Sequence, residues 1–463
     1  MPGGDGAPER SESPVAMRAS ALLRVKAVWI TPIVLASVLI ALMTLIYVGS
    51  VVDPLAHLSG LPVLVVNEDA GAALGGTQLN LGHEVTDALE HTKAVSNALS
   101  LRNVTLTKAT AEMNRNAAYA TIVIGKDFTR STLAVYGLAS TDRGNSAIPT
   151  IDVVTNPRAG SIGVSLATGV AQPALKIASL TIGSKLSALS HPSTAPSAST
   201  RALEANPLTV TTTPFRPLPP HSALGLSAFY ISLITIMCGF MAAILVNTTV
   251  DSALGYATTE IGTKWSQRAP VQITRWQTLV AKWVMVLVIV PLLVALMLAV
   301  AVGLLGMDAP FIWYLWLFTS FAGIVIGFGT LVFFAVLGAL GQLVAILVFV
   351  YLALASSGGT IPLEALPGVL RFVANFEPLR QILDGVRSIL YFNASGPAGL
   401  TRGVILTALG LVLWVVVGTV ATRLYDRAGK YRMEPEMLAF VQRSFAAYGA
   451  PKDSSDASLH SSE

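Results

Sequence analysis

The chain has 463 residues, of which 53% are hydrophobic and only 12% are charged. This composition is typical of a polytopic membrane protein. The formal net charge of +4 is too small to indicate a nucleic-acid partner. The single cysteine, Cys238, lies in an apolar run, so neither a disulfide framework nor a thiolate metal site is expected.

The polar residues 1–24 contain Gly, Pro and Ser, which predicts a disordered cytoplasmic tail. A basic flank then precedes the uncharged run 27–48. A secretory signal peptide also has a basic flank, but this run is longer than the apolar region of a signal, and no Ala-x-Ala-like cleavage site follows it. We therefore expect an uncleaved first transmembrane helix over residues 25–48.

Residues 49–221 contain no run long and apolar enough to cross a membrane. Short β-rich runs alternate there with segments of helical periodicity, which predicts an inserted α/β or α+β domain with its own core. The expected strands are 61–66, 104–106, 119–124, 150–154 and 208–211, and the expected helices are 78–101, 108–118 and 163–189. A loop is expected over residues 190–199, which are rich in Ser, Pro and Ala.

The first expected strand ends in a polar motif made of Asn67, Glu68, Asp69 and Gly71. These oxygen-bearing side chains could in principle bind a cation. We favour a structural turn at the end of the strand, because Asn and Asp side chains stabilise turns by bonding to the nearby backbone.

Five more apolar runs follow within residues 222–422, at 223–246, 283–305, 311–336, 344–355 and 403–422. The stretch 311–355 is too long for one span, so the chain is expected to turn near residues 338–342. The predicted fold class is an α-helical polytopic membrane protein with six transmembrane helices, one before and five after the inserted domain.

Lysine and arginine residues cluster in the N-terminal tail, in the connection after the second span and in the tail 423–463. The positive-inside rule makes this side cytoplasmic. We therefore expect a multi-pass protein of the cell membrane with both termini in the cytoplasm and an extracytoplasmic domain at 49–221. Within the C-terminal tail, a short helix is expected over 435–448 and disorder over 450–463.

The segment 357–392, between the last two spans, is apolar but carries charges at helical spacing. Two amphipathic helices broken by a proline suit an interfacial or re-entrant hairpin. Such a hairpin could form an extracytoplasmic gate on a translocation path, or could cap the bundle as a surface helix pair, and both interpretations stay open. The candidate gate residues are Ser357, Gly358, Gly359, Pro362, Arg380, Asp384 and Arg387.

The connection between the second and third spans combines tryptophans with basic residues. Such residues at a membrane border anchor a protein against lipid headgroups, which is the interpretation we favour. Coupling to a separate ATPase is the alternative, and its candidate residues are Arg268, Arg275, Trp276 and Lys282.

The order of one span, a large domain and five spans, with Ser357-Gly358-Gly359 between the last two, resembles the type-2 ABC exporter permeases. More narrowly, residues 65–71 and 371–387 are similar to the branch that includes the YhgE/Pip (phage infection protein) and nitrosoguanidine-resistance families. The resemblance covers residues 24–432. It implies an ABC transporter permease that exports hydrophobic or amphipathic compounds, such as a drug, a lipid or a cell-envelope component. It also implies a separate ATP-binding-cassette ATPase at the Arg275-Trp276 loop.

Catalytic motifs are missing. The sequence has no phosphate-binding Gly-x4-Gly-Lys-Ser/Thr loop and no Gly-x-Ser-x-Gly elbow, and its histidines lack metal-ligand spacing. We expect no enzyme activity, no cofactor and no metal. Ionisable residues are also missing from the middle of the later spans, which disfavours proton-driven antiport.

Two functional hypotheses remain. The preferred one is the exporter permease, working in the lipid bilayer as a homodimer or heterodimer and powered by a separate ATPase. The alternative is a non-transporting envelope protein whose extracytoplasmic domain binds a partner, such as a secretion-system component or a phage.

Overall fold

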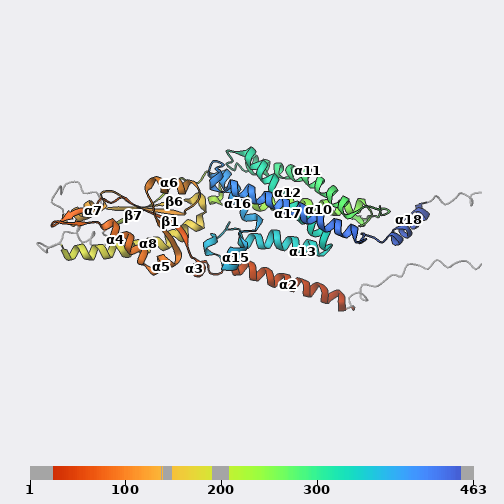
Figure 1. Cartoon of the computed structure of the whole chain (residues 1–463), viewed down its shortest axis with the longest axis horizontal. Coiled ribbons are helices and arrows are strands. Elements are labelled where there is room, and N and C mark those ends of the chain that lie inside the picture. Colours follow the sequence, from red (N-terminus) through yellow and green to blue (C-terminus); the bar gives the residue numbers. More distant parts are fainter. Residues whose placement is uncertain (1–23, 25, 137, 139–148, 190–207, 450–463) are drawn as a thin grey trace, which may run out of the picture.

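The structure, a computed structural model, describes residue 24 and residues 26–136, 138, 149–189 and 208–449. The tails expected to be disordered and the loop expected at 190–199 lie outside these residues, apart from residue 24. A sheet with its helices forms one end of the elongated molecule, and long helices form the rest (Figure 1). We call residues 61–214 the sheet domain, and we call residues 26–51 together with 223–427 the helix bundle. The bundle has a domain end, next to the sheet, and a far end.

The sheet domain contains a mixed five-stranded sheet with the order β4-β1-β5-β6-β7. β1 pairs in parallel with β4 and with β5, β6 runs antiparallel to β5, and β7 runs parallel to β6. The strands are β1 (Leu61–Asn67), β4 (Leu99–Asn103), β5 (Ala120–Ile124), β6 (Thr150–Thr155) and β7 (Thr209–Pro214). The strands predicted near 61–66, 119–124, 150–154 and 208–211 are confirmed.

Helices cover both faces of this sheet. Alternate residues of a strand point to opposite faces, so Val63 lies in one core and Leu64 in the other. The larger core lies under α4 (Leu81–His91), α5 (Lys93–Ala98) and α8 (Ser161–Leu189), and the smaller core lies under α6 (Leu106–Asn114). Burial on both faces explains why β1 is an unbroken apolar run. The remaining elements are α7 (Phe128–Val135) and the small hairpin of β2 (Ala72–Leu74) and β3 (Thr77–Leu79).

Two predicted elements of the sheet domain are wrong. The expected helix 78–101 is divided into β3, α4, α5 and the start of β4, and the expected strand 104–106 is the short connection and cap before α6, which begins at Leu106. The cause is local capping: the Asn80 side chain accepts a hydrogen bond from the His83 amide, and Thr105 accepts one from the Lys108 amide. Each cap begins a new helix and overrides the apolar spacing.

Within the described ranges, five helices are long and apolar enough to cross a membrane. They are α2 (Lys26–Val51), α10 (Ser227–Ala253), α11 (Arg275–Leu298) with its π-helical continuation (Ala299–Leu304), α12 (Ile312–Leu337) and α17 (Leu400–Arg427). A shorter apolar helix, Leu340–Ser356, comprises α13 (Leu340–Ile346), a π-helical turn (Leu347–Leu352) and α14 (Ala353–Ser356). The chain is thus a mostly helical, polytopic membrane protein with an additional sheet.

Contacts between helix ends show how the chain runs through the bundle. At the domain end, His221 Nδ1 lies 2.9 Å from the Gly306 carbonyl oxygen, and Gly359 lies against the ring of Phe229. At the far end, Gly338, with a φ of +61°, ends α12 and lines the same cavity as Asp251. The turn predicted at 338–342 is therefore confirmed. The helix Leu340–Ser356 returns the chain from the far end to the domain end.

The segment after α14 contains the two predicted helices, α15 (Gly368–Val373) and α16 (Pro378–Tyr391). α16 is buried against α10, α12 and α17, and α15 lies at the surface. Ala365, just before α15, belongs to the core of the sheet domain. The hairpin therefore connects the sheet domain with the helix bundle.

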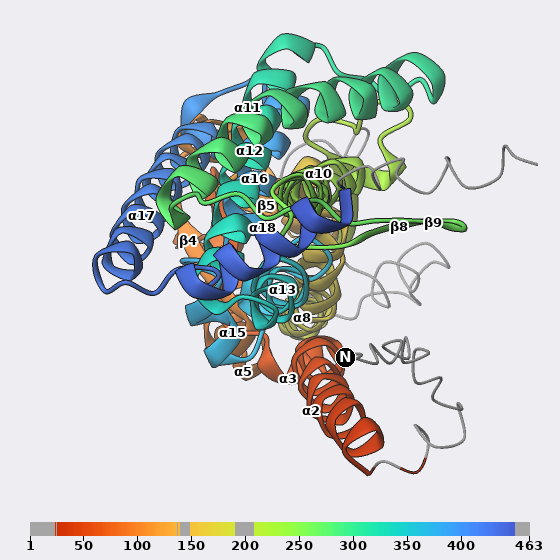
Figure 2. The same cartoon turned by 90° about the vertical axis from the view of Figure 1, so that its right-hand side faces the viewer.

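At the far end, two elements lie outside the helix bundle. The ribbon of β8 (Thr259–Ile261) and β9 (Lys264–Ser266) projects sideways, and α18 (Pro435–Gly449) crosses in front of the helix ends (Figure 2). The helix predicted over 435–448 is thereby confirmed. At the edge of the bundle, α2 packs through its second half against the helix Leu340–Ser356.

Candidate functional site

A cavity of about 730 Å³ lies between the sheet domain and the domain end of the bundle. Its walls come from the segment 115–119 before β5, from the hairpin, and from the start of α17 with the loop before it. We call it the interface cavity. Five predicted gate residues line it, namely Ser357, Gly358, Arg380, Asp384 and Arg387. The other two, Gly359 and Pro362, line a neighbouring cavity of about 170 Å³, to which Gly358 and Arg387 also contribute.

The turn that enters the hairpin needs both of its glycines, for different reasons. Gly358 has a φ of +71°, a conformation that favours glycine. A Cβ added at Gly359 would overlap the ring of Phe229 on α10, so only a residue without a side chain fits there. The Ser357 hydroxyl accepts a hydrogen bond from the Gly359 amide at 3.2 Å. These contacts place the turn directly against α10.

α16 presents its charged side chains to the interface cavity. Glu377 caps the helix by accepting hydrogen bonds from the Leu379 and Arg380 amides, and Pro378 occupies the first turn, where no amide donor is needed. Helical spacing then puts Arg380, Asp384 and Arg387 on one face. Burial raises the pKa of Glu377 to about 8, with the two amides and Arg380 opposing the rise, so the neutral carboxyl is favoured at pH 7.

Along this face Asp384 pairs with Arg380, and the carboxylate oxygen and Nε are 4.0 Å apart. Arg387, by contrast, has no ion-pair partner on this face. It is only 8% exposed, yet no described residue accepts a hydrogen bond from it or forms an ion pair with it within 4.0 Å. Asp384 is close enough for the arginine charge to oppose the rise in its pKa, but the guanidinium remains without a direct partner.

Basic groups outnumber acidic groups in the interface cavity. Four arginines line it (Arg115, Arg380, Arg387 and Arg402), against the two carboxyl groups of Glu364 and Asp384. Burial raises the pKa of both carboxyl groups, and nearby arginines oppose the rise. The site is therefore electropositive. Tyr119, from the sheet domain, stays protonated because burial raises the pKa of its phenol.

One edge of the interface cavity is apolar and reaches the surface of α17. Ile405, which is 52% exposed, and Leu406 line this edge. Further along α17, Leu409 and Val412 continue an exposed apolar face. Because α17 is long and apolar enough to span a membrane, this edge borders the surface that would meet lipid.

Arg371, on α15, holds the hairpin to the linker after α2. Its guanidinium donates to the carbonyl oxygens of Leu363, Glu364, Leu366 and His57 and to the Ser59 hydroxyl, and the Glu364 bond is 2.6 Å long. All three of its side-chain nitrogens thus donate hydrogen bonds within the protein. Its role is to fix the hairpin relative to α2.

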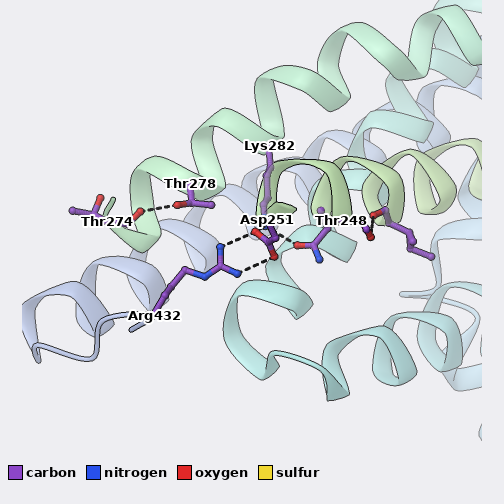
Figure 3. Close-up of polar contacts among 8 residues, drawn as sticks. Thr248, Asp251, Thr274, Thr278, Lys282 and Arg432 are labelled. Atoms are coloured by element: carbon purple, nitrogen blue, oxygen red, sulfur yellow. Dashed lines mark hydrogen bonds and ion pairs between the residues drawn. The ribbon is translucent and has the colours of Figure 1, made fainter. Parts of the chain in front are cut away.

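The far end carries a second charged cluster, on α10, α11 and the segment after α17 (Figure 3). The Asp251 carboxylate accepts hydrogen bonds from Lys282 at 2.7 Å and from two nitrogens of Arg432 at 2.7 and 2.8 Å. Lys282 also donates to the Asn247 side chain at 2.7 Å. The cluster borders a cavity of about 280 Å³. Each charge has a direct partner, and three separate parts of the chain are joined.

The predicted coupling residues fall into two groups. Arg275, Trp276 and Lys282 contact other parts of the far end: the amides of Arg275 and Trp276 donate to the Asp426 carboxylate at 2.9 and 3.1 Å, and Lys282 binds Asp251. Arg268 lies at the exposed surface, after the β8–β9 ribbon. The structure thus holds the first three together within the bundle and leaves Arg268 apart from them.

The motif after β1 organises the sheet domain. Asp69 is buried and accepts hydrogen bonds from the amides of Gly71, Gly82 and Thr129 and from the Thr129 hydroxyl. Asn67 accepts one from the Asp69 amide, and Gly71 has a φ of +71°. These contacts support the structural interpretation. In the described part of the chain, no group of three or more His, Cys, Asp or Glu residues is arranged to hold a metal ion.

The sequence matches, over residues 32–420, the family described as "Protein of unknown function (DUF3533)". The chain belongs to this family. A search of curated proteins found no match. The matched residues include the sheet domain, the hairpin and both charged clusters apart from Arg432.

Several site residues were not singled out from the sequence. Arg115 fell within the expected helix 108–118, Tyr119 was the first residue of the expected strand 119–124, and Asp251 fell just beyond the expected second span. The spacing of Asn247 and Asp251, one helical turn apart at the end of an apolar run, could have indicated a polar cluster at the membrane border.

Proposed function

We propose that this chain is the membrane permease subunit of an exporter, in which the interface cavity receives hydrophobic or amphipathic compounds on their way outward. The proposal includes six transmembrane helices, with Leu340–Ser356 as the short one, both termini in the cytoplasm and the sheet domain outside. The observation that carries it is the interface cavity itself, which combines a charged wall with an apolar edge on a bilayer-length helix. The resemblance to type-2 ABC exporter permeases supports the same function.

Energy would come from a separate ATPase, since the sequence has no phosphate-binding loop of its own. The exposed ribbon β8–β9 and Arg268 offer a free surface at the far end for such a partner, whereas Arg275 and Lys282 are occupied within the bundle. A homodimer or heterodimer fits the large apolar surface of α2, most of which no other helix covers.

Transport is tested by reconstituting the chain with each candidate ATPase in vesicles loaded with a fluorescent amphiphile. ATP-dependent efflux is expected, and its absence with every candidate would overturn the exporter. The alternative, a non-transporting envelope protein that binds a partner, predicts no flux in this assay.

Orientation is tested separately, with a cysteine at the exposed position of Gln78 in a chain whose Cys238 is replaced by alanine. A membrane-impermeant reagent should label this cysteine in intact cells. Labelling only after lysis would place the sheet domain inside and remove the basis of the exporter proposal.

A further inference from the structure

The interface cavity contains a buried cation without a partner. Arginine keeps its charge at any physiological pH and has five donors and no acceptor. Arg387 is 8% exposed, and among the described residues nothing accepts a hydrogen bond from it. Leaving a buried charge unpaired is costly, so such a group indicates that an anion is bound when the protein works.

Besides the Glu364 and Asp384 carboxyl groups, the interface cavity holds further hydrogen-bond donors. The Tyr119 hydroxyl has no hydrogen-bond partner in the described ranges, and its protonated form is a donor. Arg380 Nε is buried without a hydrogen bond. Arg402 and Arg115 line the same cavity from exposed positions. Donors from α16, α17 and the sheet domain therefore surround one space, which suits a tetrahedral anion with several acceptor oxygens.

The size and the apolar edge of the cavity indicate more than an inorganic ion. At about 730 Å³ it falls within the range of sites that enclose drug-sized ligands, roughly 300–1,000 Å³. Ile405 and Leu406 at its edge continue into the exposed apolar face of α17. A ligand held by its anionic head at Arg387 could thus extend an apolar tail along α17 toward the bilayer.

We propose that the interface cavity binds the phosphate-ester headgroup of an anionic amphiphile, with Arg387 and Tyr119 as its central contacts and its apolar chain against Ile405 and Leu406. This assignment rests on the proposed function and names the class of compound that the permease handles. The same headgroup chemistry could come from a lipid or from free phosphate, so both are tested.

The experiment uses the full chain in mild detergent and measures binding by native mass spectrometry and by the ligand-induced rise in unfolding temperature. The probes are dioctanoyl phosphatidylglycerol, dioctanoyl phosphatidylcholine, glycerophosphoglycerol and inorganic phosphate. The variant is Arg387→Gln. The control is Arg216→Gln, which removes an exposed arginine that does not line the interface cavity.

The expected result is tighter binding of phosphatidylglycerol than of phosphatidylcholine, weakened at least about tenfold by Arg387→Gln and unchanged by Arg216→Gln; a tenfold change corresponds to about 1.4 kcal/mol. Equal weakening by both variants would show general charge attraction and overturn the site. Equal binding of inorganic phosphate and phosphatidylglycerol would overturn the amphiphile. The binding assay measures no flux, so it is independent of the vesicle assay described above. Headgroup binding in this assay without ATP-dependent efflux in vesicles would refute only the exporter. ATP-dependent efflux that Arg387→Gln leaves unchanged would refute only the headgroup site.

Discussion

The two ends of the helix bundle carry charged clusters of opposite kinds. At the far end, the Asp251 carboxylate is bonded to Lys282 and to both terminal nitrogens of Arg432. At the domain end, Arg387 has no direct partner among the described residues, and the Glu364 Oε2 and Gln381 Oε1 atoms are buried without a hydrogen bond. In the far-end cluster every charge has a partner within the protein, whereas the domain-end cluster contains donors and acceptors that bond to no described residue.

This difference indicates that the two clusters have different roles. A buried charge network whose members are all paired holds helix ends together, and removing one member leaves the other charges without partners. A buried donor without a partner in the protein adds no stabilising hydrogen bond to the fold, and it stays available to a ligand. The far-end cluster should therefore respond to substitution through stability, and the domain-end cluster through binding.

The largest expected effect is at Asp251. Replacement by asparagine leaves Lys282, which is 6% exposed, beside Arg432 without a neutralising carboxylate. Breaking a buried pair in this way costs about 3–5 kcal/mol. We expect a marked fall in the thermal unfolding midpoint of Asp251→Asn in detergent.

Lys282→Met provides the matched comparison. It should cost less, because Asp251 keeps its two bonds to Arg432. Asp308→Asn, an exposed carboxylate at the domain end, should change little. A fall for Asp308→Asn as large as that for Asp251→Asn would contradict the idea of a closed network.

The second effect tests how the hairpin is seated on α10. Gly359→Ala introduces a Cβ that would overlap the Phe229 ring, so the turn must shift; overpacking of this kind costs about 1–3 kcal/mol. Gly368→Ala, where nothing lies within 4 Å of the added Cβ, is the control and should be nearly neutral. Adding Phe229→Leu to Gly359→Ala should recover part of the unfolding temperature. No recovery would mean that the contact is not the cause.

Local patterns predicted the parts of these clusters that lie on single elements. The spacing of Arg380, Asp384 and Arg387 placed three charges on one helix face, and the glycines at 358 and 359 marked the turn before it. The partners that complete each cluster come from distant segments: Arg432 is 181 positions from Asp251, and Tyr119 comes from another domain. Apolar periodicity shows which face of a helix is buried, but which helix ends meet is decided by packing of the whole chain.

The third effect is a pH dependence at Glu377. Its pKa in the folded protein, about 8, lies above the 4.5 of an unperturbed glutamate, so the folded state binds more protons between these values. Stability should therefore be highest below pH 4.5 and fall as pH rises through about 8. Glu377→Gln, which removes the charge, should gain stability relative to the native chain between pH 6 and pH 9 by about 3 kcal/mol, because the native chain loses about 1.4 kcal/mol per pH unit up to about pH 8.

The exposed Glu260→Gln on β8 serves as the control for Glu377→Gln, and its difference from the native chain should stay constant across this range. If the difference in stability between Glu377→Gln and the native chain is the same at every pH, the Glu377 carboxyl of the native chain is already ionised at pH 6. Burial then does not dominate the pKa of this helix cap.

The smallest change in stability is expected at Arg387. Methionine there removes a buried charge to which no described residue bonds directly, so the unfolding temperature of the ligand-free protein should stay the same or rise by the equivalent of about 1 kcal/mol. Arg371→Met is the matched variant: it removes a guanidinium with five acceptors and should lower stability by about 2 kcal/mol. Both arginines belong to the same hairpin. A fall for Arg387→Met equal to that for Arg371→Met would show that Arg387 holds the fold together, and its availability to an anion would then have to be abandoned.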